Sequence, residues 1–207
     1  MKKILLVKKI PSYFPIDENF IPESEGFSPI REPKNLILMQ IISLPFAFVL
    51  GFAAYLLSVF LKVSTFLTII SFYEIFLLFA LIILIIPLHE VAHALFYPER
   101  LTSERVIFGF SKKQFLFFAH FSGNIPKWQY LLIYMAPQIF LTILPILLLG
   151  FLNLAKPIES FIFWICFSNA VFGCGDLLYF MIILFQVPNG SVLRSKGYKT
   201  YFKRIDN

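Results

Sequence analysis

Two histidines and a glutamate lie within one helical turn in the run His89-Glu90-Val91-Ala92-His93. Residues i and i+4 of a helix lie about 40° apart around its axis, so both imidazoles can bind one metal ion. Glu90 is about 100° further round, where it can reach a water molecule at the ion without binding the ion itself. The pattern therefore predicts zinc-assisted hydrolysis of a peptide bond, with Glu90 as the base.

Two histidines are too few, because a catalytic zinc ion usually has three protein ligands and one position for water. The best candidate for the third ligand is Asp176, in a later apolar stretch. Cys166, Asn169, Gly173 and Asp176 recur at intervals of three and four residues, so they share one small, polar helix face. We predict Asp176 as the ligand, with His120 as the alternative. Asn169 is expected to contact substrate or to support a ligand.

The apolar residues are gathered in stretches long enough to cross a bilayer. The chain has 207 residues, of which 58% are hydrophobic and 14% charged, whereas soluble domains have about 25% charged residues. Four stretches exceed the roughly 20 residues that a membrane-spanning helix needs: Leu36–Leu61, Thr65–Phe96, Tyr130–Leu154 and Ile158–Phe185. We therefore expect an all-α integral membrane protein with four transmembrane helices. The two histidines and Glu90 fall within the second stretch, where ionisable residues are usually functional.

The basic residues are distributed unevenly along the chain. Net charge is +6, and all but Lys62 and Lys156 of the 18 Lys and Arg residues precede residue 36, follow residue 185 or lie in the loop 97–129. Loops that remain in the cytoplasm carry such an excess. The distribution predicts a multi-pass protein of the cell membrane, in contact with lipid, with both termini and the middle loop cytoplasmic. It explains the positive charge without nucleic acid as a partner.

The same pattern suggests three regions. Residues 1–35 are expected to form an irregular cytoplasmic segment, residues 36–185 the four-span domain including the loop 97–129, and residues 186–207 a basic tail. Within the loop, Arg105–Phe110 and Gln114–Phe121 are rich in β-branched and aromatic residues. These two runs predict a small cytoplasmic β hairpin.

Several short motifs resemble those of a known family. They are His89–Ala94, Ser122–Lys127, Ala136-Pro137 and the stretch from Asn169 to Gly175-Asp176. Together they resemble a bacterial domain-of-unknown-function family described as putative zincin peptidases. The arrangement is also similar to the site-2 proteases, intramembrane metalloproteases that pair a His-Glu-x-x-His helix with a later helix bearing an aspartate ligand. In that group the aspartate precedes a glycine, whereas Asp176 follows one.

The resemblance implies a zinc-dependent peptidase that acts on a peptide or membrane-protein substrate at or just inside the cytoplasmic leaflet. In this interpretation His89, His93 and Asp176 bind the zinc ion. The alternative is a non-catalytic accessory or immunity-type membrane protein that uses the same fold. The two differ in whether Glu90 is needed for function.

Overall fold

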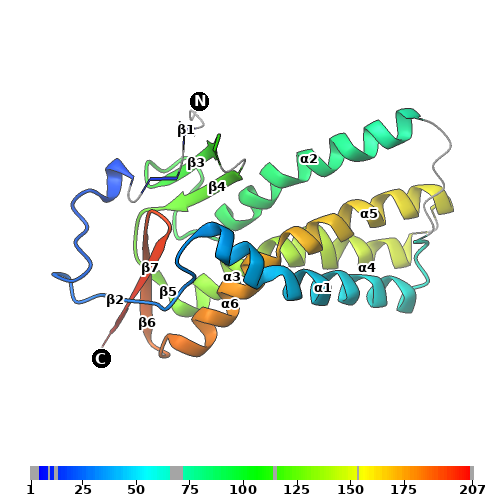
Figure 1. The fold of residues 1–207 in the computed structure, drawn as a ribbon. Coiled ribbons are helices and arrows are strands. Elements are labelled where there is room, and N and C mark those ends of the chain that lie inside the picture. Colours follow the sequence, from blue (N-terminus) through cyan, green and yellow to red (C-terminus); the bar gives the residue numbers. More distant parts are fainter. Residues whose placement is uncertain are drawn as a thin grey trace. The chain divides into compact units, whose positions relative to one another are not determined.

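The computed structural model describes residues 5–8, 10–11, 14–65, 72–113, 116–152 and 154–205. Its elements, in chain order, are β1 (Leu5–Val7), the 3-10 helix η1 (Pro15–Asp17), β2 (Ser28–Pro29), α1 (Leu36–Phe60), α2 (Phe72–Ala94), β3 (Val106–Ser111), β4 (Leu116–Phe121), β5 (Ile125–Pro126), α3 (Lys127–Gln138), the π-helix η2 (Ile139–Ile143), α4 (Leu144–Phe151), α5 (Lys156–Phe172), α6 (Cys174–Gln186), β6 (Ser191–Lys196) and β7 (Lys199–Arg204) (Figure 1).

The chain divides into two compact units. The first unit consists of residues 1–35, 90–134 and 179–207, and the second of residues 36–89 and 135–178. The first contains all the strands, and the second contains most of the apolar helices. The division falls inside α2, α3 and α6, each of which is continuous across it.

Three helices of the described chain are long and apolar enough to cross a membrane: α1, α2 and the continuous run α3–η2–α4. The pair α5 and α6 makes a fourth span if it is counted as one, with a bend of 43°. This supports the expected membrane protein, with three to four spans rather than four straight ones. The expected second span starts later than Thr65, because α2 begins at Phe72. Residues 66–71 lie outside the described part of the chain.

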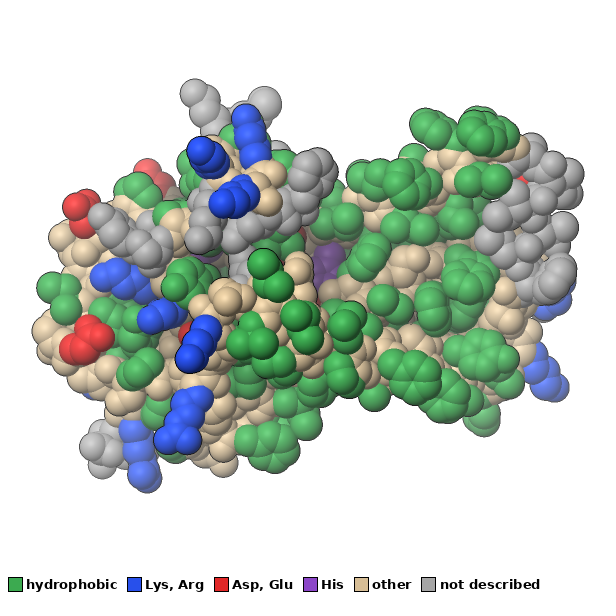
Figure 2. Space-filling model, in the orientation of Figure 1, with side chains coloured by type: hydrophobic (Ala, Val, Ile, Leu, Met, Phe, Trp, Pro, Cys, Tyr) green, Lys and Arg blue, Asp and Glu red, His purple; other side chains and the backbone are tan. Residues whose placement is uncertain are grey.

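Large apolar side chains point outward from these helices. Phe48 is 74% exposed, Phe60 80% and Phe72 85%. Figure 2 shows hydrophobic side chains over most of the visible surface of the helices. Such a surface is unfavourable in water but is suited to lipid hydrocarbon.

The first unit contains two small sheets. The expected hairpin is confirmed, since β3 and β4 pair antiparallel from Val106↔Phe121 to Ser111↔Leu116. The expectation of helices with only one hairpin is wrong, because seven strands form sheets of order β1-β3-β4 and β2-β7-β6-β5. Strands β1 and β2 come from the segment expected to be irregular. These strands have two to six residues and mostly pair with distant segments, so they leave little local pattern.

The pairing joins the three basic regions of the sequence. β1 of the N-terminal segment pairs with β3 of the middle loop, β2 pairs with β7 of the tail, and β5 pairs with β6. Strands of one sheet lie on one side of a bilayer, because open sheets do not cross it. A shared side for the termini and the loop, which the charge distribution predicts, is compatible with this pairing and stays a prediction. That this side is the cytoplasm remains a prediction.

In the second unit, α5 ends where it meets α3. Gly173 follows the last residue of α5, and a Cβ atom there would lie 1.8 Å from Nε2 of Gln138. The same Nε2 donates to the carbonyl oxygens of Asn169 and Ala170, at 3.4 and 3.3 Å. The carbonyl of Asn169 also accepts from the N–H of Gly173 at 3.0 Å, so the Gln138 side chain adds a second donor at the end of α5. The absence of a side chain at Gly173 therefore makes room for Gln138 of α3.

We predict that Gly173→Ala destabilises the protein by about 1–3 kcal/mol, because the new methyl group must displace the Gln138 side chain. Gly175→Ala is the matched control. A Cβ atom at Gly175 would have only the flexible end of Met39 nearby, at 3.8 Å. Thermal unfolding in detergent should therefore separate the two variants, and equal melting temperatures would contradict the prediction.

Candidate metal centre

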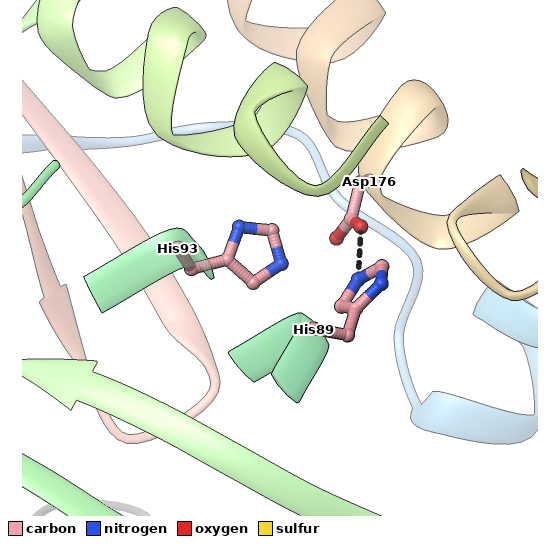
Figure 3. Close-up of side chains that lie close together, drawn as sticks. All are labelled: His89, His93 and Asp176. Carbon is pink, nitrogen blue, oxygen red and sulfur yellow. Dashed lines mark hydrogen bonds and ion pairs between the residues drawn. The ribbon is translucent and has the colours of Figure 1, made fainter. Parts of the chain in front are cut away.

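His89 is held between two side chains of the second unit. It lies near the end of α2 and is buried. Its Nε2 atom is 2.7 Å from Oδ2 of Asp176, and its Nδ1 atom is 3.0 Å from Oδ1 of Asn169 (Figure 3 shows the Asp176 contact). Asp176 is in the first turn of α6, where the helix dipole stabilises a carboxylate.

Asn169 accepts a hydrogen bond from Nδ1 of His89. The Nδ2 group of Asn169 donates to the carbonyl oxygen of Pro137 at 3.1 Å and to Oγ1 of Thr142 at 2.9 Å. The amide orientation is therefore fixed, and Oδ1 faces His89 as an acceptor. His89 therefore donates from Nδ1, and Nε2, which lies 2.7 Å from Oδ2 of Asp176, is the nitrogen left to bind a metal ion when the ring is neutral. Of the two roles expected for Asn169, this geometry fits support of a ligand.

Nδ1 of His93, like Nδ1 of His89, faces a hydrogen-bond acceptor, which here lies in the first unit. Its Nδ1 atom lies 2.8 Å from the carbonyl oxygen of Ile133, and its ring is edge-on to Tyr134 with the centroids 6.0 Å apart. A carbonyl oxygen only accepts, so Nδ1 of His93 donates and the lone pair lies on Nε2. Metal-bound histidines almost always have such a partner on the second nitrogen.

Glu90 is held by the backbone of β4. Its Oε2 atom accepts a hydrogen bond of 2.8 Å from the N–H of Ala119. In an antiparallel ladder, hydrogen-bonded pairs alternate with pairs that are not hydrogen-bonded. Ser122 N–H donates to Arg105 O, so the pair of Ala119 with Phe108 is of the second kind. The N–H of Ala119 therefore points away from β3. A charged acceptor makes this a strong hydrogen bond, which fixes one oxygen of the carboxylate.

Within the described part of the chain, one group of His, Cys, Asp and Glu side chains can hold a metal ion, and it comprises His89, His93 and Asp176. Each offers one ligand atom, and these atoms lie within 4.8 Å of one another (Figure 3). One turn of the continuous helix α2 sets the spacing of the two imidazoles. Two imidazoles and a carboxylate fit the donor set of a catalytic zinc site.

The alternative ligand, His120, is engaged elsewhere in the first unit. Its Nε2 atom lies 2.7 Å from Oδ2 of the fully buried Asp17. Asp17 also accepts hydrogen bonds from Ser122 and, at 3.4 Å, from Arg194. Burial alone would raise the pKa of Asp17, but the hydrogen bonds from His120, Ser122 and Arg194 outweigh it and lower the pKa. His120 is thus part of a buried ion-pair cluster and not of the metal-ligand group.

Some contributors to the site cannot be found from side-chain patterns. The N–H of Ala119 and the carbonyl of Ile133 are backbone groups, which every sequence position has. Asp17 lies far from its partners along the chain, and the residues around it show no periodicity. Pro137 stands out in the sequence as a proline inside an apolar stretch and as part of a motif, but its contact with Asn169 is made by its backbone carbonyl.

Comparison with known proteins gives one match. A family model described as putative zincin peptidase matches residues 82–192, which is more than half of the chain. The matched range contains the ligand group, Glu90 and Asn169. No curated protein and no solved structure matches the chain.

We predict that Asp176→Asn lowers the zinc content of the purified protein far below the roughly one ion per chain expected of the wild type, because an amide is a poor ligand for zinc. His120→Gln is the matched control, since it removes an imidazole but keeps a donor for Asp17. It should retain zinc. Zinc loss in His120→Gln together with full retention in Asp176→Asn would instead place the third ligand on β4.

We also predict that Asn169→Leu weakens zinc binding by about 10- to 100-fold, because His89 loses the acceptor that orients it. The substitution keeps the branching at Cγ but replaces the amide group by two methyl groups. Ser168→Ala is the control, because that hydroxyl donates to the carbonyl of Trp164 and not to the site. Competition with a chromophoric chelator measures both affinities, and the same value in both variants would rule out the role.

Proposed function

This chain belongs to the family described as putative zincin peptidase, and we propose that it is a zinc-dependent peptidase that cuts peptide bonds within or beside the membrane. The observation that carries the proposal is the common orientation of His89 and His93. Each donates its Nδ1 proton to an acceptor, at 3.0 and 2.8 Å, so that Nε2 is the ligand atom. Asp176 supplies the carboxylate, and Glu90 follows His89 on the same helix.

Zinc held by these residues would act as a Lewis acid that polarises the peptide carbonyl and lowers the pKa of water to about 7. Glu90 takes the proton from the attacking water and delivers it to the leaving amide nitrogen. The N–H of Ala119 holds Oε2 of Glu90, so the carboxylate keeps its direction through both transfers. Asn169 and the carbonyl of Ile133 keep the two imidazoles in the tautomer that zinc binding needs.

The edge of β4 provides a place for an extended substrate. Ser122 N–H donates to Arg105 O at 2.8 Å, so Phe117, Ala119 and Phe121 direct their backbone groups away from β3. In the described chain no strand pairs with that side of β4. A peptide segment adds to this edge through main-chain hydrogen bonds, beside the residue that holds Glu90.

The substrate class follows from where the motif lies. His89 and Glu90 belong to α2, a candidate membrane span, so the cleaved bond belongs to a membrane-embedded or membrane-adjacent segment of a peptide or membrane protein. The proposal places the termini and the middle loop, which carry nearly all the basic residues, on one side of the membrane. In this proposal that side is the cytoplasm.

We predict that Glu90→Gln abolishes cleavage, by at least about 10²-fold, while zinc content stays at the wild-type level. The amide oxygen of the new side chain can still accept from Ala119, so the local structure is kept. New peptide N-termini in membranes of cells that produce the wild type or the variant, compared by mass spectrometry, measure the cleavage.

Glu74→Gln is the control, because it makes the same substitution in the first turn of α2. It should leave cleavage unchanged. If zinc-loaded wild type and Glu90→Gln protein give the same N-termini, the protein is not a peptidase and the non-catalytic accessory function is favoured.

A further inference from the structure

Two carbonyl groups of α3 support side chains of the candidate metal centre. The carbonyl oxygen of Ile133 accepts from Nδ1 of His93 at 2.8 Å. The carbonyl oxygen of Pro137 accepts from Nδ2 of Asn169 at 3.1 Å, and Asn169 in turn orients His89. Ile133 and Pro137 stand at positions i and i+4 of the same helix.

This spacing matters because of ordinary helix hydrogen bonding. In an α-helix the carbonyl of residue i accepts from the N–H of residue i+4. Proline has no N–H, so residue 137 cannot donate to Ile133. Any other residue at position 137 would bring an N–H to the carbonyl that His93 uses.

The surroundings of Pro137 fit a specific role. Its side chain is among the fully buried ones of the described chain, and the π-helix η2 begins two residues later, at Ile139. A proline inside a helix is destabilising, and a π-helical turn often marks a functional region. Pro145, on the same run of helix, also lacks an N–H, but it lies twelve residues beyond Ile133, whose carbonyl accepts from His93.

We propose that Pro137 is a positioning residue for the metal ligand His93. By withholding a backbone donor it reserves the Ile133 carbonyl for Nδ1 of His93, which keeps the proton on that nitrogen and the lone pair on Nε2. Pro137 contacts neither metal nor substrate in this role. The inference rests on the proposed zinc site and adds to it a residue that acts through the helix backbone.

The test uses two variants of the full-length protein that both restore the N–H. Pro137→Ala leaves a small cavity, whereas Pro137→Val keeps the volume close to that of proline. Pro145→Ala is the matched control. Zinc affinity is measured by chelator competition in detergent, and the melting temperature is measured on the zinc-free protein.

Both Pro137 variants should bind zinc about 10- to 100-fold more weakly, and Pro145→Ala should bind as the wild type does. The zinc-free melting temperature of the Pro137 variants should be equal to or higher than that of the wild type, because a helix-breaking residue is removed. A role in stability alone would move affinity and melting temperature downward together.

Wild-type zinc affinity in both Pro137 variants would overturn the inference. Weaker zinc binding in Pro137→Ala alone would also overturn it, because that result would point to lost side-chain volume. A lowered melting temperature of both zinc-free variants would overturn it as well. Equally weak zinc binding in Pro145→Ala would also overturn it, because the effect would then not be specific to residue 137. A wild-type protein that binds no zinc would refute the proposed function itself, which is a different result from zinc-loaded protein that is insensitive to residue 137.

Discussion

The candidate site depends on where two protons lie. A neutral imidazole binds a metal through the nitrogen that has no proton, so His89 and His93 each need an acceptor for the other nitrogen. Asn169 supplies one acceptor and the Ile133 carbonyl the other. Each acceptor depends on further structure, because Pro137 and Thr142 orient the Asn169 amide. The contact of α3 with α5 therefore bears on the proposed metal binding.

Irregular helices make this arrangement possible in an apolar environment. A buried polar group without a partner costs about 1–3 kcal/mol, and in a regular helix each carbonyl already accepts from a backbone N–H. The π-helix η2 presents Thr142, which accepts from Asn169 and donates to the carbonyl of Cys166 at 3.2 Å. Gly173 ends α5 and admits the Gln138 side chain. The breaks in α3 and α5 thus supply the partners that polar side chains need away from water.

The strands of the first unit hold the proposed base, Glu90, through β4. His120 and Ser122 at the end of β4 bind Asp17 of the N-terminal segment, which also accepts from Arg194 of β6. Breaking a buried charge pair by removing one partner is strongly destabilising, so this cluster ties β4 to both the N-terminal segment and the tail. Asp17 and Arg194 lie outside the range of the family match. They support a strand whose backbone orients Glu90.

The sequence by itself determined the features that depend on local spacing. One helical turn places His89 beside His93, runs of apolar residues indicate the membrane helices, and β-rich runs indicate the β3–β4 hairpin. Only the tertiary structure decided between Asp176 and His120 as a member of the group that can hold a metal, because that choice depends on which elements meet. It also decided the remaining strand pairs and the acceptor at Ile133. Contacts between distant segments and backbone hydrogen bonds have no sequence signature, because every residue carries the same backbone groups.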